Sequence, residues 1–451
     1  MHYFFIGIAG DGMSALAQYA TGKGHKVSGS DRQFSKQKST ERRKKLEAEG
    51  INCFPQDESG ITKSIDKVVI STAIEPTVPE YIKAKKLGIK IIMRSVLLAE
   101  FCNTQNTVAV SGTSGKSTVT AMIYTIFDYA GLSPSLITGA GLVNLQNKGK
   151  IGNAVAGQSE ILIIEADESD GSLIKYKPQT GLILNIEKDH KTIKELRKLF
   201  SKFSENTQNE LIVNRSNAES SSFSKGSDYD FMKAPYQPVK LNESVNGITF
   251  QLADTDFSIP QIGAYNAENA TAAIATAAKY GVSIKTASEA LKSYHGIHRR
   301  NQILGIAKGI TVIDDYAHNP AKLSAALKAC QALSQKVFLW FQPHGFGPTK
   351  FLHSEFVKEL SDTARPNDEI IFSEIYYAGG TADKSISAED LIKDMQKKNT
   401  TAVYLKNRKE LVTYILANTK KNAILLLCGA RDPSLNSFAE EVFEKLKNNN
   451  K

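Results

Sequence analysis

The sequence predicts an α/β protein with parallel sheets, divided into three domains. Short apolar runs typical of buried strands alternate with helical stretches along the whole chain, as in proteins whose parallel strands are joined by helices. The chain has 451 residues, and since a domain usually takes roughly 150, about three domains are expected. Hydrophobic residues make up 41% and charged residues 23%, a composition that supplies a core and argues against long disordered regions.

The composition also limits where the protein is expected to act. No apolar run reaches the roughly 18 residues of a membrane-spanning helix, and Met1–Gly7 lacks the basic segment and cleavage site of a secretion signal. The four cysteines lie far apart without a C-x-x-C pair, which argues against a zinc site or disulfides and favours a reducing compartment. We therefore expect a cytoplasmic protein with no membrane partner.

The net charge of +9 raises the possibility of a nucleic-acid partner. The basic residues are mostly interspersed with acids, as in Glu41–Glu47, and this pattern is typical of a solvated helix face. We expect no nucleic-acid binding. A basic balance also suits a substrate that carries phosphates.

The first predicted domain, residues 1–104, begins with a Rossmann-like βαβ unit. An apolar strand, Tyr3–Ile8, leads into the glycine turn Gly7–Ser14, and a helical stretch then leads to a second strand, Lys26–Asp31. Strand, glycine turn, helix, strand and acid in this order indicate nucleotide or dinucleotide binding. The spacing G-x-x-G-x-G is not the strict G-x-G-x-x-G, so a tight turn without a ligand is the alternative. The same domain continues with the strands Lys67–Ser71 and Lys90–Met93 and the helix Pro79–Lys86.

The second predicted domain, residues 105–297, follows the polar linker Asn103–Asn106 and opens with a P-loop. The strand Thr107–Ser111 is followed by Gly112-Thr113-Ser114-Gly115-Lys116-Ser117-Thr118 and then by a helix. Glycines let backbone N–H groups approach phosphate oxygens, and the helix N-terminus favours negative charge. Lys116 can reach the β- and γ-phosphates of a nucleotide, and the Ser117 hydroxyl can bind Mg²⁺. Val110 stands where the full P-loop pattern has its first glycine.

Two acidic segments follow later strands of the same domain. Glu165–Asp170 lies at the end of the strand Ile161–Ile164, and Asn185–His190 closes the strand Gly181–Asn185. Clustered acids repel one another unless a cation or solvent relieves them, and an ATPase places its metal carboxylate at such a strand end. Adjacent parallel strands would bring Glu165 and His190 to one edge, so we expect both to bind Mg²⁺. The alternatives are a solvated acidic loop and a structural histidine.

The rest of the chain continues the alternation of strands and helices. The second domain ends with a polar surface loop over Ser216–Asp230 and an alanine-rich helix over Ala270–Lys279. The third predicted domain, residues 298–451, has the same α/β pattern. Its expected strands are Ile310–Ile313, Lys336–Phe341, Glu369–Phe372 and Ala423–Leu427.

Six motifs in order give the chain a resemblance to the Mur ligases, the ATP-dependent amino-acid ligases of peptidoglycan synthesis. Within that family it most resembles the branch that joins L-alanine to UDP-N-acetylmuramate. The opening glycine turn and Gly29-Ser30-Asp31 also fit. The motifs are Gly112–Thr118, Glu165–Asp170, Asn185–His190, Gly263–Ala273, Arg299-Arg300 and Asp314–Pro320.

The resemblance implies a role for each matched residue. ATP phosphates would be held by Gly112–Thr118, with Lys116 and Ser117 foremost, and Mg²⁺ by Ser117, Glu165 and His190. Asn269 would contact adenine with Tyr265 stacking nearby, Arg300 would reach the γ-phosphate, and Asp315 would complete the nucleotide site from a Rossmann-like third domain. The UDP moiety would be bound by Gly10, Gly12, Met13, Ser14 and Asp31.

The implied reaction passes through an acyl phosphate. The substrate carboxylate attacks the γ-phosphorus of ATP, and the amino group of an amino acid or short peptide then attacks the resulting carbonyl. Charge builds on the transferring phosphoryl oxygens, so Lys, Arg and Mg²⁺ are the groups required. We expect a monomer or weak homodimer.

One segment departs from the family pattern. After a strand of the third domain the family carries F-Q-P-H-R-Y-T-R-T-R, whereas this chain reads Phe341–Lys350, with Gly345 and Pro348 in place of the two internal arginines. One of those arginines helps to hold the amino acid's carboxylate in the family, and Lys350 is the cation left in this loop. We expect His344 and Lys350 to serve the amino-acid end of the site, with looser selectivity because a lysine lacks the bidentate fork of an arginine.

The identity of the acceptor therefore stays open. A murein tripeptide recycling ligase, which joins a whole peptide to the same nucleotide sugar, is the alternative within the family. An NAD-dependent oxidoreductase using the first βαβ unit and a nucleic-acid-dependent NTPase are the alternatives outside it. The oxidoreductase would need neither the P-loop nor the Asp314–Pro320 motif.

Overall fold

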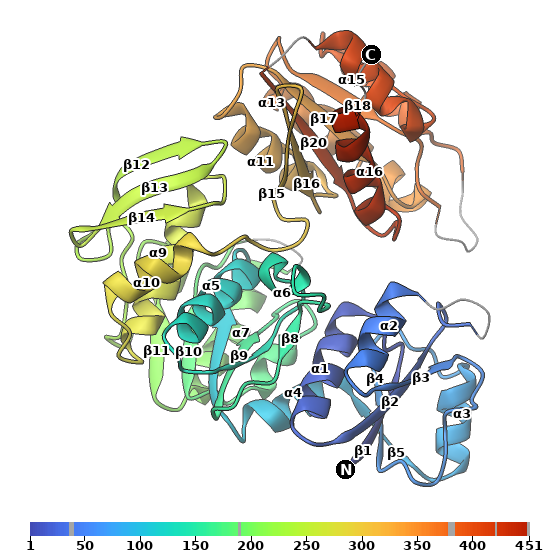
Figure 1. The fold of residues 1–451 in the computed structure, drawn as a ribbon, viewed down its shortest axis with the longest axis vertical. Coiled ribbons are helices and arrows are strands. Elements are labelled where there is room, and N and C mark those ends of the chain that lie inside the picture. The colour runs from blue at the N-terminus through green and yellow to red at the C-terminus, as the bar shows by residue number, and fades with distance from the viewer. Residues whose placement is uncertain (36–39, 188–190, 378–383, 420–421, 449–451) are drawn as a thin grey trace. The chain divides into compact units, whose positions relative to one another are not determined.

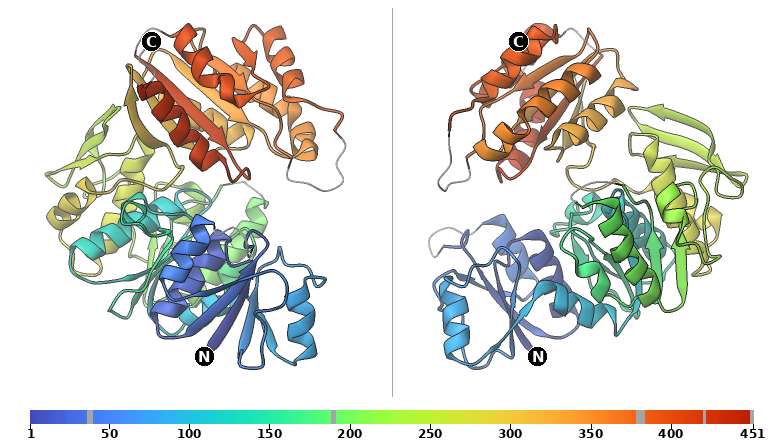
Figure 2. Two further views of the ribbon diagram at one scale, coloured as in Figure 1. Left: turned by 45° about the vertical axis from the view of Figure 1, so that its right-hand side comes forward. Right: turned by 180° about the vertical axis from the view of Figure 1, so that it is seen from behind.

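The structure is a computed structural model that describes residues 1–35, 40–187, 191–377, 384–419 and 422–448. The chain separates into two compact units, each with helices packed on parallel sheets (Figures 1 and 2). The first unit holds Met1–Leu241, Thr249–Pro260 and Tyr265–His298, and the second holds Asn242–Ile248, Gln261–Ala264 and Arg299–Lys451. The α/β class predicted from the sequence is confirmed.

The first sheet has the order β3-β2-β1-β4-β5, with every neighbouring pair parallel. Along β1, Tyr3 and Phe5 face one apolar cluster while Phe4 and Ile6 face another. Alternate residues of a strand point to opposite faces, so this sheet is buried on both sides, as parallel sheets require. Its elements are β1 (His2–Ile6), α1 (Asp11–Gly22), β2 (Lys26–Asp31), α2 (Glu41–Ala48), β3 (Asn52–Pro55), β4 (Lys67–Ile70), α3 (Pro79–Lys86), β5 (Lys90–Met93) and α4 (Arg94–Cys102).

The second sheet of the first unit has the order β11-β10-β6-β9-β7-β8. Strand β6 lies between β9 and β10, parallel to both, so the loops that leave these three strands emerge at one edge. The strands are β6 (Asn106–Ser111), β7 (Ser135–Ile137), β8 (Ala154–Val155), β9 (Ile161–Glu165), β10 (Thr180–Ile183) and β11 (Glu210–Val213). The helices are α5 (Lys116–Tyr129), α6 (Val143–Gln146), α7 (Ile193–Asn206), α8 (Ala218–Ser221), α9 (Tyr265–Ala278) and α10 (Ile284–Lys292), with a 3₁₀ turn at Ser172–Lys175.

The sheet of the second unit has the order β15-β16-β20-β17-β18-β19. Val337, Leu339 and Phe341 of β17 pack with α11, α13 and α14, whereas Phe338 and Trp340 pack with α15 and α16. The strands are β15 (Gln302–Ala307), β16 (Ile310–Asp315), β17 (Val337–Gln342), β18 (Glu369–Phe372), β19 (Ala402–Tyr404) and β20 (Ala423–Gly429). The helices are α11 (Pro320–Gln331), α12 (Phe346–Phe351), α13 (His353–Thr363), α14 (Ala388–Lys397), α15 (Leu411–Asn418) and α16 (Leu435–Asn448), with a 3₁₀ turn at Arg408–Glu410.

Some elements differ from the sequence-based expectation. Strand β8 is antiparallel to β7 and β15 to β16, and a fourth sheet, with three strands, consists of β12 (Val239–Ser244), β13 (Gly247–Leu252) and β14 (Thr255–Ile259). Edge strands and strands with one solvated face mix polar and apolar residues, so they lack the continuous apolar run of a buried strand. The polar stretch 216–230, expected to be a loop, contains the short helix α8.

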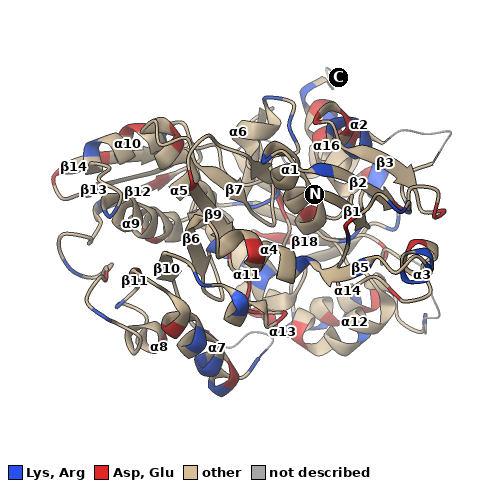
Figure 3. Ribbon diagram, turned by 90° about the horizontal axis from the view of Figure 1, so that it is seen from below, with Lys and Arg blue, Asp and Glu red and all other residues tan. Residues whose placement is uncertain are grey.

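The basic segment Glu41–Glu47 lies in α2, as expected for a solvated helix face. Arg43 pairs with Glu47 and Lys44 with Glu41, and Leu46 is the buried residue of the helix. Figure 3 likewise shows blue and red segments side by side on α2 and α7. All four cysteines are free and buried. Within the described ranges, no helix is both long and apolar enough to cross a membrane.

Candidate active site

The predicted phosphate loop connects β6 to α5. Gly112 and Gly115 have φ values of +143° and +82°, where side chains with a Cβ are disfavoured. A Cβ on Gly115 would also lie 2.7 Å from Oδ1 of Asn269. The Val119 amide donates to the Gly115 carbonyl, so the amides of residues 116–118 precede the first hydrogen bond of the helix. Such a helix N-terminus is an anion-binding site.

Asn185 fixes the shape of this loop from the end of the neighbouring strand. Its side-chain oxygen accepts hydrogen bonds from the Thr113 hydroxyl at 2.9 Å and from the Ser114 amide at 2.8 Å, and its amide group donates to the Ser114 carbonyl. The Thr113 hydroxyl in turn accepts from the Glu187 amide. Part of the Asn185–His190 motif therefore positions the phosphate loop, a role that the spacing of the sequence did not indicate.

The Lys116 side chain is held in place beside the phosphate loop by two hydrogen bonds. Its ammonium donates to the Gly112 carbonyl and to Oε2 of Glu168, each at 2.8 Å, and Asp167 lies 3.8 Å away. Burial raises the pKa of the Glu168 carboxyl, although the Lys116 ammonium opposes that shift. For Asp167, burial also acts to raise the pKa, but hydrogen bonds from Ser169 and the charge of Lys116 prevail and lower it. Acids of the 165–170 segment thus neutralise Lys116 within this structure.

Glu165 lies at the end of β9 beside the first turn of α5. Its Oε1 accepts from the Ser117 hydroxyl at 2.9 Å, and its Oε2 accepts from the Thr138 hydroxyl and the Gly139 amide, both at 2.9 Å. A carboxylate and a hydroxyl side by side are hard oxygen donors of the kind that Mg²⁺ takes, and Mg²⁺ in nucleotide sites usually has only one or two protein carboxylates together with phosphates and waters. The residues present fit this ion.

The expected partner of Glu165, His190, lies outside the described residues together with Lys188 and Asp189. Its pairing with Glu165 therefore stays a prediction. Among the described residues, no group of three or more His, Cys, Asp or Glu side chains has the geometry of a metal site.

The residues predicted to bind adenine lie on the first turns of α9. Tyr265 is 46% exposed, so a planar base could stack on its ring. Asn269 follows one turn later, donates to Asn266 Oδ1 at 3.1 Å and lies against Gly115 of the phosphate loop. The first turn of α9 is thus next to the loop.

The glycine turn after β1 is tied down by Asp31 at the end of β2. One oxygen of Asp31 accepts from the Ala9 amide at 3.0 Å and the other from the Gln33 amide at 2.9 Å. Gly10 is the N-cap of α1, and Met13 is buried in the core. Asp31 therefore shapes the turn through both of its oxygens.

Two arginines that the sequence did not single out lie at the N-terminus of α1. Arg42 donates to Oδ1 of Asp11 at 2.7 Å and to the Ser14 hydroxyl at 3.1 Å. A Cβ on Gly12 would lie 3.1 Å from the Arg94 guanidinium, so this glycine lets the arginine approach the helix. Each arginine is paired with an acid, Arg42 with Asp11 and Arg94 with Asp170, so an anionic group at this helix N-terminus would have to exchange with these acids.

In the second unit, the paired acids at the end of β16 are both buried. Arg299 donates to both oxygens of Asp314, at 3.1 and 3.0 Å, and also to the Gly429 carbonyl. Asp315 accepts from the amides of Asn301 and Ala317, both at 2.7 Å, and burial raises its pKa. These acids order the segment around Arg299.

The cations predicted for the second unit lie at the same edge of its sheet. The Arg300 guanidinium lies over the Tyr316 ring, 5.3 Å from its centre. Lys350 is on the short helix α12 and donates to the Ser385 hydroxyl at 2.8 Å. The rings of His318 and His344 lie 5.8 Å apart. Burial lowers the pKa of both imidazoles, that of His344 to about 4.

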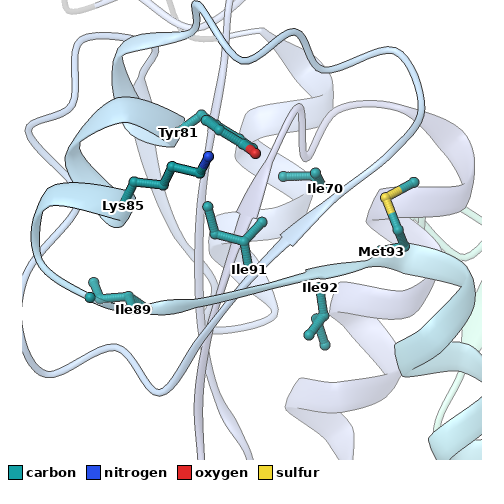
Figure 4. Close-up of a pocket in the computed structure, with 8 residues that line it drawn as sticks. Ile70, Tyr81, Lys85, Ile89, Ile91, Ile92 and Met93 are labelled. Atoms are coloured by element: carbon teal, nitrogen blue, oxygen red, sulfur yellow. The ribbon is translucent and has the colours of Figure 1, made fainter.

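A cavity of about 440 Å³ lies elsewhere in the first unit, between α3 and the strands β4 and β5 (Figure 4). Its lining mixes isoleucines with Tyr81 and Lys85 and includes no residue predicted to bind nucleotide, sugar or metal. The lining residues are Ile70, Tyr81, Lys85, Gly88, Ile89, Ile91, Ile92 and Met93.

Three sequence profiles match successive parts of the chain. The Mur ligase family catalytic domain matches residues 2–106, the Mur ligase middle domain residues 110–277, and the Mur ligase glutamate ligase domain residues 299–431. The chain belongs to the Mur ligase family. The resemblance inferred from the six motifs is thereby confirmed.

Individual Mur ligases match over nearly their full length. The UDP-N-acetylmuramate–L-alanine ligase of Carboxydothermus hydrogenoformans is 36% identical over 94% of this chain and 93% of its own. That of Acetivibrio thermocellus is 34% identical over 96% and 93%. The crystal structure of the UDP-N-acetylmuramate–alanine ligase MurC from Thermotoga maritima has a TM-score of 0.81 and 25% identity, with 99% of each chain covered. A murein peptide ligase from Psychrobacter arcticus shares the fold, with a TM-score of 0.66 and 19% identity over 99% of each chain.

Proposed function

We propose that this Mur ligase joins L-alanine to UDP-N-acetylmuramate, with ATP converted to ADP and phosphate, in peptidoglycan precursor synthesis. The observation that carries the proposal is the arrangement of Lys116, Ser117 and Glu165 around the start of α5. The similarity to L-alanine ligases along almost the whole chain supports the substrate. We keep the division into a UDP-sugar domain (1–104), an ATP domain (105–297) and a ligase domain (298–451), which the three profile matches support.

The phosphate loop would perform the first half of the reaction. The amides of residues 116–118, which precede the first hydrogen bond of α5, bind the phosphate oxygens, and Lys116 turns from Glu168 to the β- and γ-phosphates as they enter. Ser117, Glu165 and His190 would hold Mg²⁺, which would neutralise charge on the transferring phosphoryl group. Arg300 supplies a further cation for the γ-phosphate, and the sugar carboxylate displaces ADP to give the acyl phosphate. These groups act where charge develops, so they lower the barrier electrostatically.

The nucleotide sugar would be held at the N-terminus of α1. Gly10, Gly12 and Ser14 lie at the start of this helix, and Asp31 keeps the preceding turn in shape. Arg42 and Arg94 add the positive charge that a diphosphate requires. Met13 supports this site from the core.

The second half of the reaction needs the amino acid at the ligase domain. Its amino group attacks the acyl phosphate carbonyl, and phosphate leaves. His344 and Lys350 were predicted for this end of the site from the sequence, and their roles stay predictions. We also propose a cytoplasmic location and a monomer or weak homodimer, with no nucleic-acid partner.

A murein peptide ligase is the second candidate. The L-alanine branch of the family is expected to have arginines where this chain has Gly345 and Pro348. The NAD-dependent oxidoreductase is disfavoured, because that chemistry has no use for Lys116 and its loop. The test is a phosphate-release assay with UDP-N-acetylmuramate and ATP against a panel of free amino acids and the murein tripeptide. The proposal requires release with L-alanine above that with the tripeptide.

A further inference from the structure

Three side chains that the sequence scatters over more than one hundred residues meet at one sheet edge of the second unit. His318 follows β16, His344 follows β17, and Arg431 follows β20. Strand β20 lies between the other two, with Asp315 opposite Cys428 and Gln342 opposite Gly429. The carboxyl ends of all three strands therefore coincide. The positive charge of Arg431 contributes to lowering the pKa of both histidines, so it lies close to each.

Arg431 is exposed, has no partner for its guanidinium among the described residues and adopts a strained backbone conformation, as expected of a residue that binds a ligand. It is exposed, and its guanidinium makes no ion pair or hydrogen bond within the described ranges of the chain. Its φ is +62°, a left-handed conformation that costs a side chain with a Cβ on the order of 1 to 2 kcal/mol. Strain of this kind at a strand end is typical of functional positions. The neighbouring Asp432 is bound by Arg408 at 2.8 Å and does not neutralise Arg431.

Three other cations near this edge already have partners, and Lys322 adds its charge to His318. Arg299 is bound to Asp314 and the Gly429 carbonyl, and Lys350 donates to the Ser385 hydroxyl. Arg300 lies over the Tyr316 ring, which is beside His318. In the proposed function Arg300 binds the γ-phosphate of ATP. Of Arg299, Arg300, Lys350 and Arg431, only Arg431 is available to a second anion.

The two histidines suit an amino-acid substrate at this position. Nδ1 of His318 lies 2.9 Å from the Tyr316 carbonyl, so that nitrogen carries a proton and Nε2 is an acceptor. Nδ1 of His344 is buried without a hydrogen-bond partner among the described residues. Neutral imidazoles can accept hydrogen bonds from the amino group of a substrate, whereas charged ones would repel it.

We propose that Arg431 binds the α-carboxylate of the incoming amino acid, in the place of the arginines absent at Gly345 and Pro348. The inference rests on the proposed function and assigns it a further specificity-determining residue. A guanidinium can hold a carboxylate through two parallel hydrogen bonds, which the Lys350 ammonium cannot do. Ligands of open α/β sheets bind at this edge, beyond the carboxyl ends of the strands.

The experiment compares L-alanine with L-alaninamide, in which a neutral amide replaces the carboxylate. The KM for each amine and for ATP is measured in wild type, Arg431→Gln, Arg431→Lys and Arg431→Gly, and also in Lys350→Ala, which tests the competing assignment of the carboxylate to Lys350. Arg431→Gln should raise the KM for L-alanine about tenfold or more, a loss typical of a charge-assisted pair, and leave those for L-alaninamide and ATP nearly unchanged. Arg431→Lys should recover part of the loss.

Arg431→Gly is the variant that separates loss of the side chain from misfolding, because glycine adopts the left-handed conformation without strain. This variant should melt no lower than wild type and still show the higher KM for L-alanine. An unchanged preference for L-alanine over L-alaninamide in Arg431→Gln would overturn the inference, as would loss of that preference in Lys350→Ala alone. A wild-type protein that ligates no amine would instead overturn the proposed function.

Discussion

The Ser117 hydroxyl donates a 2.9 Å hydrogen bond to Oε1 of Glu165. It joins the first turn of α5 to the end of β9, and so places a hydroxyl and a carboxylate, both proposed to bind Mg²⁺, next to each other. The second oxygen of Glu165 is bound by Thr138 and Gly139. Glu165 is thus fixed in orientation, which is what an ion with strict octahedral geometry requires.

Glu165→Gln should raise the Mg²⁺ concentration needed for half-maximal ligation, because an amide is a weaker ligand than a carboxylate. Glutamine has nearly the same shape, so the melting temperature should change little, whereas Glu165→Ala would remove three hydrogen bonds and destabilise the site. Mg²⁺ titrations of ADP formation provide the measurement. His190→Ala should shift the same titration, and a variant that keeps both its rate and its Mg²⁺ dependence would show that its residue is structural.

Lys116→Met should lower kcat/KM by about a hundredfold or more, since an electrostatic contact of this kind is worth roughly 3 kcal/mol in the transition state. The same change leaves buried Glu168 without its cation, so the pKa of that carboxyl should rise further. Lys191→Met is the control, because Lys191 contacts the Ser169 carbonyl of the same acidic segment. Near-normal turnover of folded Lys116→Met would refute the role of the loop.

Gly115→Ala should weaken ATP binding and stability together. It forces a side chain into a left-handed conformation and places its Cβ 2.7 Å from Asn269 Oδ1. Gly131→Ala is matched to it, since Gly131 has a φ of +76° and nothing lies within 4 Å of its Cβ. Backbone strain should lower the free energy of unfolding of both variants by about 1 kcal/mol. Gly115→Ala alone should show a larger decrease and weaker ATP binding. Calorimetric titration and denaturant unfolding would measure the two effects, and equal losses in both variants would contradict the prediction.

His344 should make stability depend on pH. Its pKa falls from 6.5 to about 4, mainly because the imidazole is buried and to a smaller extent because the positive charges of His318 and Arg431 lie nearby. Between these values the unfolded chain binds a proton that the folded chain does not, so the stabilisation is complete above pH 6.5 and declines as the pH falls towards 4. Urea unfolding at several pH values should show a steeper loss for wild type than for His344→Gln. Parallel curves would show that this imidazole is not buried in the neutral form.

The sequence predicted the parts of the site that are local in the chain. The strand, loop and helix around Lys116 and the acids after β9 are contiguous, so their residue types and spacing were enough. Arg431 could not be found in this way, because its meaning depends on β20 inserting between β16 and β17. The hydrogen bonds from the phosphate loop to Asn185 were not predicted for a similar reason, since Ser114 precedes Asn185 by 71 residues.

The most direct test of the account is ADP formation by the purified protein with Mg²⁺, ATP and UDP-N-acetylmuramate, with and without L-alanine. The account predicts that ADP forms only when both the nucleotide sugar and the amino acid are present, together with one equivalent of UDP-N-acetylmuramoyl-L-alanine detected by mass spectrometry. ADP formation that requires the murein tripeptide in place of L-alanine, or no product with either, would contradict it.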